Sequence, residues 1–369
     1  MAKIKSIKGR QVFDSRGNPT VEAEIFLENG MSATAIVPSG ASTGSHEAFE
    51  LRDKSITKFL GKSVFKAVEN INTKISKALK GMECSDQKKI DDTLINLDGT
   101  KQKKKLGANS ILASSISSCK LAAKENNIPL YKYLGGQEAN QLPVPLMNVI
   151  NGGAHANNLL RIQEFMIRPE KSKSFSEAME TCFLVIQKLK YELSKKHFSL
   201  ALGDEGGFAP DLAFNDEAIR LINLAIKKAG FKPGEDVSIC LDVASNELYK
   251  NGRYSIKDHK YLTFYDTHMY YRSLIKKYSI KSIEDPFEEN AWSSWTTFTK
   301  NHDIQIVGDD LFATNNDRLM IGIKSRAANA ILIKPNQIGT VTETLKVIET
   351  AKNNNFRTII SHRSGDSED

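Results

Sequence analysis

Apolar and polar residues alternate in short runs at the start of the chain, from Lys3 to about Ala35. Residues typical of turns interrupt the alternation at 16–19 and again at 28–30. A period of two is typical of half-buried strands, and Gly, Pro and Asn mark the turns between them. The pattern therefore predicts a meander of antiparallel strands.

A helical spacing follows these strands. Apolar residues recur at intervals of three and four over 63–80, 86–97 and 107–126. Three helices with one apolar face can cover one side of the preceding sheet. We therefore predict an α+β domain over residues 1–137, which ends in a connector of glycine, polar residues and two prolines.

The rest of the chain, residues 138–369, shows a third pattern. Two apolar runs, VPLMNVI and IQEFMI, precede long helical stretches at about 174–198 and 215–229. Strand-like runs then follow, the later ones about 25 residues apart, which is the length of one strand, one helix and two short loops. Such a series is typical of βα units around a parallel sheet that is buried on both faces.

Five of these strand-like runs end in a charged or titratable residue. These residues are Asp242, Glu284, Asp309, Lys334 and His362. Reactive side chains at successive strand ends are typical of a (β/α) barrel, where they converge on one mouth. An open doubly wound sheet is the alternative, although no GxGxxG motif follows its first strand.

Composition excludes several classes of protein. The 369 residues are 40% hydrophobic and 26% charged, and they contain no apolar run long enough for a membrane span. The net charge of +7 is spread over helical stretches, so we expect a solvated lysine-rich surface and no nucleic-acid partner. The four cysteines lack CxxC spacing and are expected to be buried thiols. The start of the sequence lacks a secretory signal, which predicts a cytoplasmic protein.

Three of the strand ends carry carboxylates, Asp242, Glu284 and Asp309. An oxygen-only ligand set suits Mg²⁺ and is poor for zinc. Spacing alone leaves a second interpretation open, in which these acids cap the following helices or pair with lysines. Lys334 favours the metal site, because a lysine beside a divalent ion in a dry site can act as a base. A salt bridge from Lys334 to one of the acids is its structural alternative.

Three glycine-rich segments accompany these strands, at 38–44, 151–157 and 203–210. Singly, each is more often a turn than a mobile loop that approaches an anion. Ten segments in order resemble the motifs of the enolase family: FDSRGNPTVEAE, VPSGASTG, INGGAHANN, IQEFMI, GDEGGFAP, LDVASNELY, SIEDPF, GDDLFATN, LIKPNQIGT and SHRSGDSED. The resemblance extends from residue 3 to residue 369.

This resemblance implies both a fold and an activity. The implied fold is α/β, an N-terminal α+β capping domain followed by an enolase-type ββαα(βα)n TIM-like barrel that lacks its last strand. The implied activity is that of phosphopyruvate hydratase, the Mg²⁺-dependent reversible dehydration of 2-phospho-D-glycerate to phosphoenolpyruvate in glycolysis and gluconeogenesis. Related racemases and cycloisomerases carry a lysine pair where this chain has Gln163, Glu164 and Phe165, which favours enolase itself.

The resemblance also implies two Mg²⁺ ions in each active site. Asp242, Glu284 and Asp309 resemble the ligands of the tighter ion. Ser42 resembles a ligand of the second ion, which arrives with the substrate. Two dications suit this reaction, because removal of the C2 proton produces a doubly charged enolate. Mg²⁺ with a lysine base is the known pattern of the enolase superfamily.

The family motifs imply roles for further side chains. Lys334 corresponds to the base that removes the C2 proton, and Glu205 to the acid that protonates the leaving C3 hydroxyl. Glu164 corresponds to a carboxylate that keeps Glu205 protonated by like-charge repulsion. The implied substrate-binding residues are His155, Glu164, Glu284, Asp309, Arg363 and Ser364. In this set the planar guanidinium of Arg363 suits a phosphate group.

The resemblance sets further expectations. A homodimer or an octamer is expected, mainly in the cytoplasm, with a cell-surface or secreted pool in addition. Enolases continue past SHRSGDSED with an eighth barrel strand, so we expect this chain to be a fragment that is inactive alone. The alternatives are a truncated homologue with weak or no catalysis and a surface-exposed binding protein. The truncated homologue is disfavoured because the catalytic acids and Lys334 are all present. The binding protein is disfavoured because the C-terminal lysines that often support such binding are missing.

Overall fold

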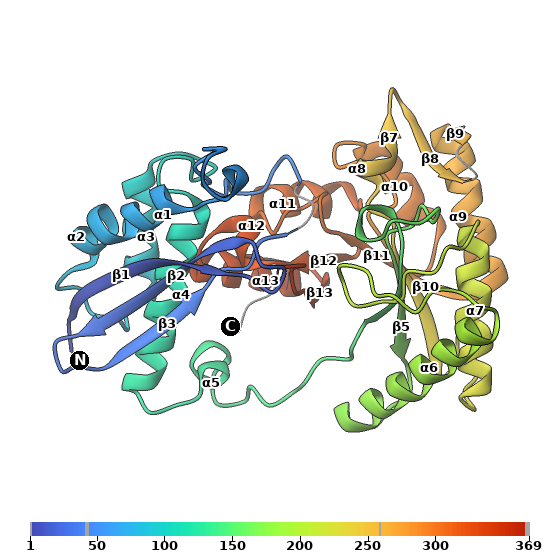
Figure 1. Ribbon diagram of the computed structural model, residues 1–369, viewed down its shortest axis with the longest axis horizontal. Helices are drawn as coiled ribbons and strands as arrows, with labels where there is room; N and C mark the ends of the chain where they lie inside the picture. Colours follow the sequence, from blue (N-terminus) through green and yellow to red (C-terminus); the bar gives the residue numbers. More distant parts are fainter. Residues whose placement is uncertain (1, 41–43, 258–259, 366–369) are drawn as a thin grey trace. The chain divides into compact units, whose positions relative to one another are not determined.

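The structure, a computed structural model, forms two compact units. The residues that it describes are 2–40, 44–257 and 260–365. The first unit comprises Met1–Asn140, Ala313–Leu319 and Leu332–Asp369, and the second comprises Gln141–Phe312 and Met320–Ile331. Figure 1 labels the helices and strands of each unit.

The first unit begins with the predicted meander. Strands β1 (Ile4–Phe13), β2 (Pro19–Leu27) and β3 (Ser32–Ile36) pair antiparallel in the order β1-β2-β3. Alternate residues of β2 are buried, because successive side chains of a strand point to opposite faces. Val21 and Ile25 are fully buried members of that inner row.

Helices cover this sheet close to the predicted positions. The first is a continuous run of α1 (Phe65–Asn70), a π-helical turn (Ile71–Ile75) and α2 (Ser76–Leu79). It is followed by α3 (Gln87–Asp98) and α4 (Ala108–Glu125). Helix α4 packs against β2 and β3 and is buried on nearly all sides (Figure 1).

Serine hydroxyls of α4 donate hydrogen bonds to backbone carbonyl oxygens one turn earlier in the chain. The hydroxyls of Ser110, Ser114 and Ser118 donate to the carbonyl oxygens of Leu106, Ser110 and Ser114, one turn earlier. A buried hydroxyl without a partner would be costly, and this local bond removes the cost. A serine-rich helix can therefore lie in the core of the first unit.

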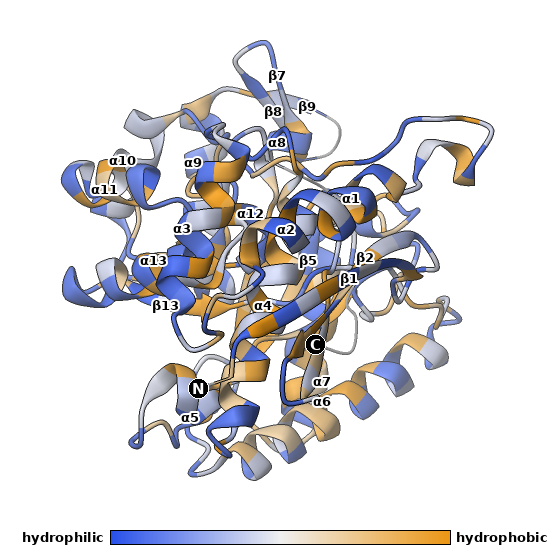
Figure 2. Cartoon of the chain, turned by 90° about the vertical axis from the view of Figure 1, so that its left-hand side faces the viewer, coloured by the Kyte–Doolittle hydropathy of each residue, from blue (hydrophilic) through white to orange (hydrophobic). Residues whose placement is uncertain are grey.

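The second unit opens with two strands and two helices. Strand β4 (Met147–Asn151) pairs antiparallel with β5 (Glu164–Pro169), and β5 pairs antiparallel with β6 (Val237–Asp242). Helices α6 (Phe175–Lys195) and α7 (Asn215–Lys228) lie between β5 and β6 in the chain. Hydrophobic and hydrophilic residues are interspersed along both helices (Figure 2), as the sequence predicted. This is the ββαα start of the predicted fold.

Regular βα units follow. The helices are α9 (Phe264–Tyr278), α10 (Trp292–Asn301) and α11 (Asn316–Ser325), and the strands are β10 (Ile280–Glu284), β11 (Gln305–Gly308) and β12 (Ala330–Ile333). Strands β6, β10, β11 and β12 pair parallel. Strand β12 continues into the first unit, which also holds α12 (Pro335–Ile338), α13 (Val341–Asn353) and β13 (Arg357–Ile360). The strand order β13-β12-β11-β10-β6-β5-β4 makes this an α/β fold, in which β4 and β13 are edges among the described residues.

Several short elements were not predicted. Helices α5 (Leu130–Gly135) and α8 (Ser245–Leu248) span only six and four residues. Strands β7 (Tyr249–Lys250), β8 (Arg253–Lys257) and β9 (Lys260–Leu262) form a small antiparallel sheet. Elements this short contain too few residues to show a period.

The cysteines are as predicted. Cys84, Cys119, Cys182 and Cys240 are all buried free thiols. Burial raises the pKa of Cys182 and of Cys240 to about 11, so neither thiol is ionised near neutral pH.

A histidine pair lies beside the aromatic core of the second unit. The Nε2 atoms of His268 and His302 are 3.2 Å apart, and both rings pack against Phe298. Burial lowers the pKa of His302 to about 4, and the charges of His268 and Arg272 contribute. Burial also lowers the pKa of His268. The imidazole of His302 is therefore neutral near pH 7.

We expect acid to destabilise the protein through His302. Its pKa is about 4 in the folded state and about 6.5 in an unfolded chain, so the unfolded state binds the proton first. The contribution to stability is complete above about pH 6.5 and decreases as the pH falls toward 4. His302→Gln should flatten this part of the pH profile in urea unfolding, whereas His197→Gln, at an exposed position, should not. An unchanged profile for His302→Gln would contradict the assignment.

Candidate active site

Two carboxylates lie at neighbouring strand ends of the second unit. Asp242 is the last residue of β6 and Glu284 the last residue of β10, and the two are paired in register. They are only 6% and 7% exposed. Burial of ionised carboxylates is costly unless hydrogen bonds or cations compensate. The strand register therefore places two costly acids side by side.

Two donors hold the carboxylate of Asp242 in place. The backbone N–H of Ala244 donates to Oδ1 at 3.0 Å, and the side-chain amide of Gln163 donates to Oδ2 at 3.0 Å. Ala244 has a φ of 46°, a left-handed conformation that costs energy in a residue with a side chain. This strained conformation occurs where the backbone N–H of Ala244 points toward the carboxylate of Asp242.

Asp285 organises a second group of acids. This residue follows β10 directly, is 3% exposed, and accepts the backbone N–H groups of Asp309 at 3.0 Å and of Asp310 at 2.8 Å. Carboxylate oxygens of the three residues lie within 4.8 Å of one another. Asp309 was predicted from the sequence, whereas Asp285 and Asp310 were not. The sequence signal that could have identified them is the pair of consecutive acids at each strand end, Glu284-Asp285 and Asp309-Asp310.

Negatively charged side chains gather at these strand ends. Burial raises the pKa of Asp285 well above its usual value, and the charges of Asp310, Asp309 and Asp242 raise it further. A divalent cation would offset negative charge here. The donors are all oxygen atoms, which fits a hard cation such as Mg²⁺. Of the three acids predicted as metal ligands, Asp309 belongs to this group, while Asp242 and Glu284 are neighbours at the ends of β6 and β10.

Asn246, on α8, orients one of these acids from the side. Its amide nitrogen donates to Asp310 at 2.8 Å and to Glu289 at 3.1 Å, while its oxygen accepts the backbone N–H of Glu289 at 2.9 Å. Amide and carboxylate groups that hold a neighbour of a metal ligand strongly affect metal affinity. No spacing or motif rule predicted a role for Asn246.

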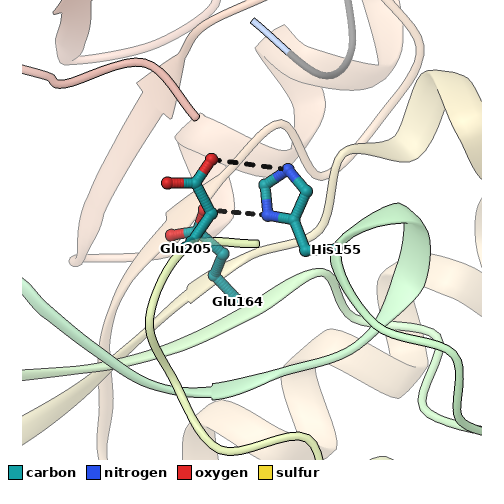
Figure 3. A group of neighbouring side chains, drawn as sticks. All are labelled: His155, Glu164 and Glu205. Carbon is teal, nitrogen blue, oxygen red and sulfur yellow. Dashed lines mark ion pairs between the residues drawn. The ribbon is translucent and has the colours of Figure 1, made fainter. Parts of the chain in front are cut away.

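A second cluster joins His155, Glu164 and Glu205. The Nδ1 atom of His155 lies 3.3 Å from Glu164 and its Nε2 atom lies 3.7 Å from Glu205. Figure 3 shows both carboxylates on the same side of the imidazole, each joined to one ring nitrogen by a dashed line. All three side chains are largely shielded from water. The structure thus brings together three residues that lie far apart in the sequence.

The imidazole of His155 experiences opposing effects. Burial alone would lower its pKa, but the hydrogen bond and charge of Glu164, with the charges of Glu205 and Asp242, raise the pKa above its usual value. A cationic imidazole between two carboxylates is favoured by this arrangement. The cluster can therefore hold and exchange protons among three groups.

Two glycine-rich loops position this cluster. The backbone N–H of Asp204 donates to the carbonyl oxygen of His155 at 3.0 Å. A Cβ atom on Gly203 would lie 2.6 Å from that same oxygen and 2.7 Å from the side chain of Asn151. Only glycine permits this approach, so the segment that carries Glu205 lies directly against the segment that carries His155.

The first unit holds the remaining predicted residues. Lys334 follows β12 directly, and its backbone N–H donates to the hydroxyl of Thr314 at 2.9 Å. Arg363 and Ser364 follow β13, and the buried guanidinium of Arg363 lies 3.3 Å from the carboxylate of Glu47. Ser42 lies outside the described residues.

Arg363 lines a cavity of about 410 Å³ within the first unit. Lys104 and Asn336 also line this cavity. Gly40 packs directly against the guanidinium, because a Cβ atom there would lie 2.0 Å from Nη2 of Arg363. The cavity therefore holds a fixed guanidinium and a second cation, together with the acids Glu47 and Glu50, and the planar guanidinium is the group suited to bind an anion.

In the part of the chain that the structure describes, no helix has both the length and the apolar character needed to cross a membrane.

Comparisons with known proteins identify the family. Residues 4–134 match the family model described as "Enolase, N-terminal domain", and residues 139–369 match "Enolase, C-terminal TIM barrel domain". A relative from Pelagibacter ubique (strain HTCC1062), named "Enolase", is 58% identical over 370 residues, which is 100% of this chain and 88% of that protein. The chain therefore belongs to the enolase family, the metal-dependent lyases that dehydrate 2-phosphoglycerate to phosphoenolpyruvate in glycolysis.

Proposed function

We propose that Lys334 and Glu205 divide the two proton transfers of this dehydration. The reaction removes a proton from C2 and the hydroxyl group from C3. Lys334 takes the C2 proton, and Glu205 protonates the hydroxyl, because hydroxide is too basic to leave unaided. Support for Lys334 comes from its position directly after β12, and support for Glu205 comes from its burial beside His155.

Glu164 and His155 set the protonation of Glu205. The negative charge of Glu164 favours the protonated acid by like-charge repulsion, which is the state that can donate. After donation, the adjacent cationic imidazole of His155 compensates the charge on Glu205 at 3.7 Å. Glu164 and His155 therefore act on the protonation of Glu205 in opposite directions, Glu164 favouring the acid and His155 the carboxylate.

Asp242, Glu284 and Asp309 are our proposed ligands for the tighter of two Mg²⁺ ions, and Ser42 for the second. When bound, the two ions supply positive charge that stabilises the enolate. The observation in favour is the group of carboxylates at the strand ends, where burial and the charges of Asp310, Asp309 and Asp242 raise the pKa of Asp285. Asp285 contributes indirectly, because it accepts the backbone N–H of Asp309 and fixes that segment.

Arg363 and Ser364 are our proposed residues for the substrate phosphate. The observation in favour is the cavity of about 410 Å³ beside Arg363, with Lys104 as a second cation. The ion pair between Arg363 and Glu47 keeps the guanidinium oriented. We propose His155, Glu164, Glu284 and Asp309 as the other residues that contact the substrate.

A Glu205→Gln variant separates the two proton transfers. We expect dehydration to slow by about 10²–10⁴-fold, because glutamine cannot protonate the leaving hydroxyl. Exchange of the C2 proton with deuterated solvent, followed by NMR of 2-phosphoglycerate, should persist because Lys334 is unchanged. Glu180→Gln, at an exposed position on α6, should leave both rates unchanged. Equal loss of exchange and dehydration in Glu205→Gln would contradict the division of roles.

We also propose a homodimer or octamer, a location in the cytoplasm, and a domain boundary after residue 137. Family membership is the support for each of these. Sedimentation of the purified protein tests the assembly. A catalytically dead homologue is less favoured, because the complete set of Glu164, Glu205, Asp242, Glu284, Asp309 and Lys334 is present.

A further inference from the structure

A second cavity lies within the second unit, with a volume of about 240 Å³. Its walls come from the loop before β5, the start of α7, the end of β8 and the middle of α9. None of the residues that line it is among those assigned to dehydration.

A buried asparagine holds these walls together. Asn215, the first residue of α7, is 6% exposed. Its oxygen accepts the backbone N–H of Arg161 at 3.0 Å, and its nitrogen donates to the carbonyl oxygen of Ile256 at 2.9 Å and to the hydroxyl of Tyr270 at 3.2 Å. One side chain thus pins three chain segments, so the cavity is preformed.

Most of the charged residues in the described lining are cations. Arg161, Arg220 and Lys257 line the cavity, and the acid among them is Asp216. The carboxylate of Asp216 already binds Lys277 at 3.2 Å and the hydroxyl of Tyr278 at 2.9 Å. Positive charge therefore exceeds negative charge on these walls.

Aromatic surface accompanies the cations. The ammonium group of Lys257 lies 5.7 Å from the ring centre of Tyr270, and the side chain of Phe214 is half exposed at the cavity wall. Small-molecule sites typically combine apolar walls with a few charged groups that fix orientation. The volume is below the range of about 300–1,000 Å³ that is usual for drug-sized ligands, so the occupant is small.

The cavity is also lined by residues on the segments that follow the two glycine-rich loops of the His155 cluster. Arg161 lies on the segment that follows His155, and Phe214 on the segment that follows Glu205. The amide of Asn158 bonds to the carbonyl oxygens of Asn151 at 2.9 Å and of Pro210 at 3.1 Å, which ties these segments together. A ligand in the cavity would therefore restrain the loops that carry His155 and Glu205.

We propose that this cavity is an effector site for a small organic anion, a carboxylate or phosphate monoester that carries one apolar ring. The cations bind its acidic group and the aromatic wall packs against its ring. Binding restrains the two loops that hold the His155 cluster.

Isothermal titration with benzoate and with phenyl phosphate tests the binding and distinguishes a carboxylate ligand from a phosphate ligand. We expect Arg220→Gln and Lys257→Gln each to weaken binding about tenfold or more, because a hydrogen bond to a charged group is lost. Lys227→Gln removes the same charge farther along α7, outside the cavity lining, and should have no effect. Ala213→Phe, which fills the cavity, should abolish binding.

Three results would overturn the proposal. One is that neither probe binds the wild-type protein, and another is equal affinity in wild-type protein and all four variants. The third is equal affinity for inorganic phosphate and phenyl phosphate, which would remove the role of the ring. Amide hydrogen exchange across 152–162 and 203–214 should slow when the probe binds, and an unchanged rate would overturn the effector role. These measurements require no turnover, so their failure is distinguishable from failure of the dehydration assignment.

Discussion

Replacing Lys334 with alanine should slow the dehydration of 2-phosphoglycerate by about 10²–10⁴-fold, the usual contribution of a general base. Exchange of the C2 proton should fall by the same factor, because Lys334 is the proposed group that removes this proton. The residue lies directly after β12, as Asp242 and Glu284 lie at the ends of β6 and β10. Absorbance of phosphoenolpyruvate and NMR of deuterium exchange measure the two rates.

Lys346→Ala provides the matched control for Lys334→Ala. Lys346 is an exposed lysine on α13, so its loss changes the net charge equally without touching the strand end. We expect wild-type rates from this variant. C2 exchange that persists in Lys334→Ala while dehydration is lost would assign the base to another residue.

Removal of divalent metal should abolish dehydration, and Asp242→Asn should weaken Mg²⁺ binding by at least tenfold. Asparagine keeps the size of the side chain but removes one of the buried charges that a dication would offset. Because a ligand that binds only the folded state stabilises it, added Mg²⁺ should also raise the thermal midpoint of the wild-type protein. That increase should be much smaller in Asp242→Asn.

Asp317→Asn controls for the loss of a negative charge elsewhere. The side chain of Asp317 is 77% exposed on α11, so the variant should bind Mg²⁺ like the wild type. Calorimetric titration with Mg²⁺ measures the affinities. Equal affinity in Asp242→Asn and the wild-type protein would contradict the assignment of Asp242 as a ligand.

The sequence predicted the main elements because their signals are local. The period of two in β2 and the apolar stripes of α3, α6 and α7 arise from residues a few positions apart. The titratable residues that end successive strands likewise predicted where Asp242 and Glu284 lie. Their register as neighbours then follows from the parallel pairing of β6 and β10.

Other parts of the site depend on contacts that no local pattern shows. Asp285 supports the acids by accepting backbone N–H groups more than twenty residues away, and Asn246 reaches Asp310 across a still longer separation. The partner of Arg363 is Glu47, 316 residues earlier. A side chain that acts through tertiary hydrogen bonds has no signature in spacing. The short strands β7, β8 and β9 were missed for lack of a measurable period.

The most direct test of the central claim is the rise in ultraviolet absorbance when 2-phosphoglycerate becomes phosphoenolpyruvate, with and without Mg²⁺. The assay should include this chain and a form extended by the part of the Pelagibacter ubique relative that it does not match; this chain covers 88% of that relative. We expect a Mg²⁺-dependent rise in the extended form that disappears in its Lys334→Ala variant. No rise in either form at any Mg²⁺ concentration would contradict the account.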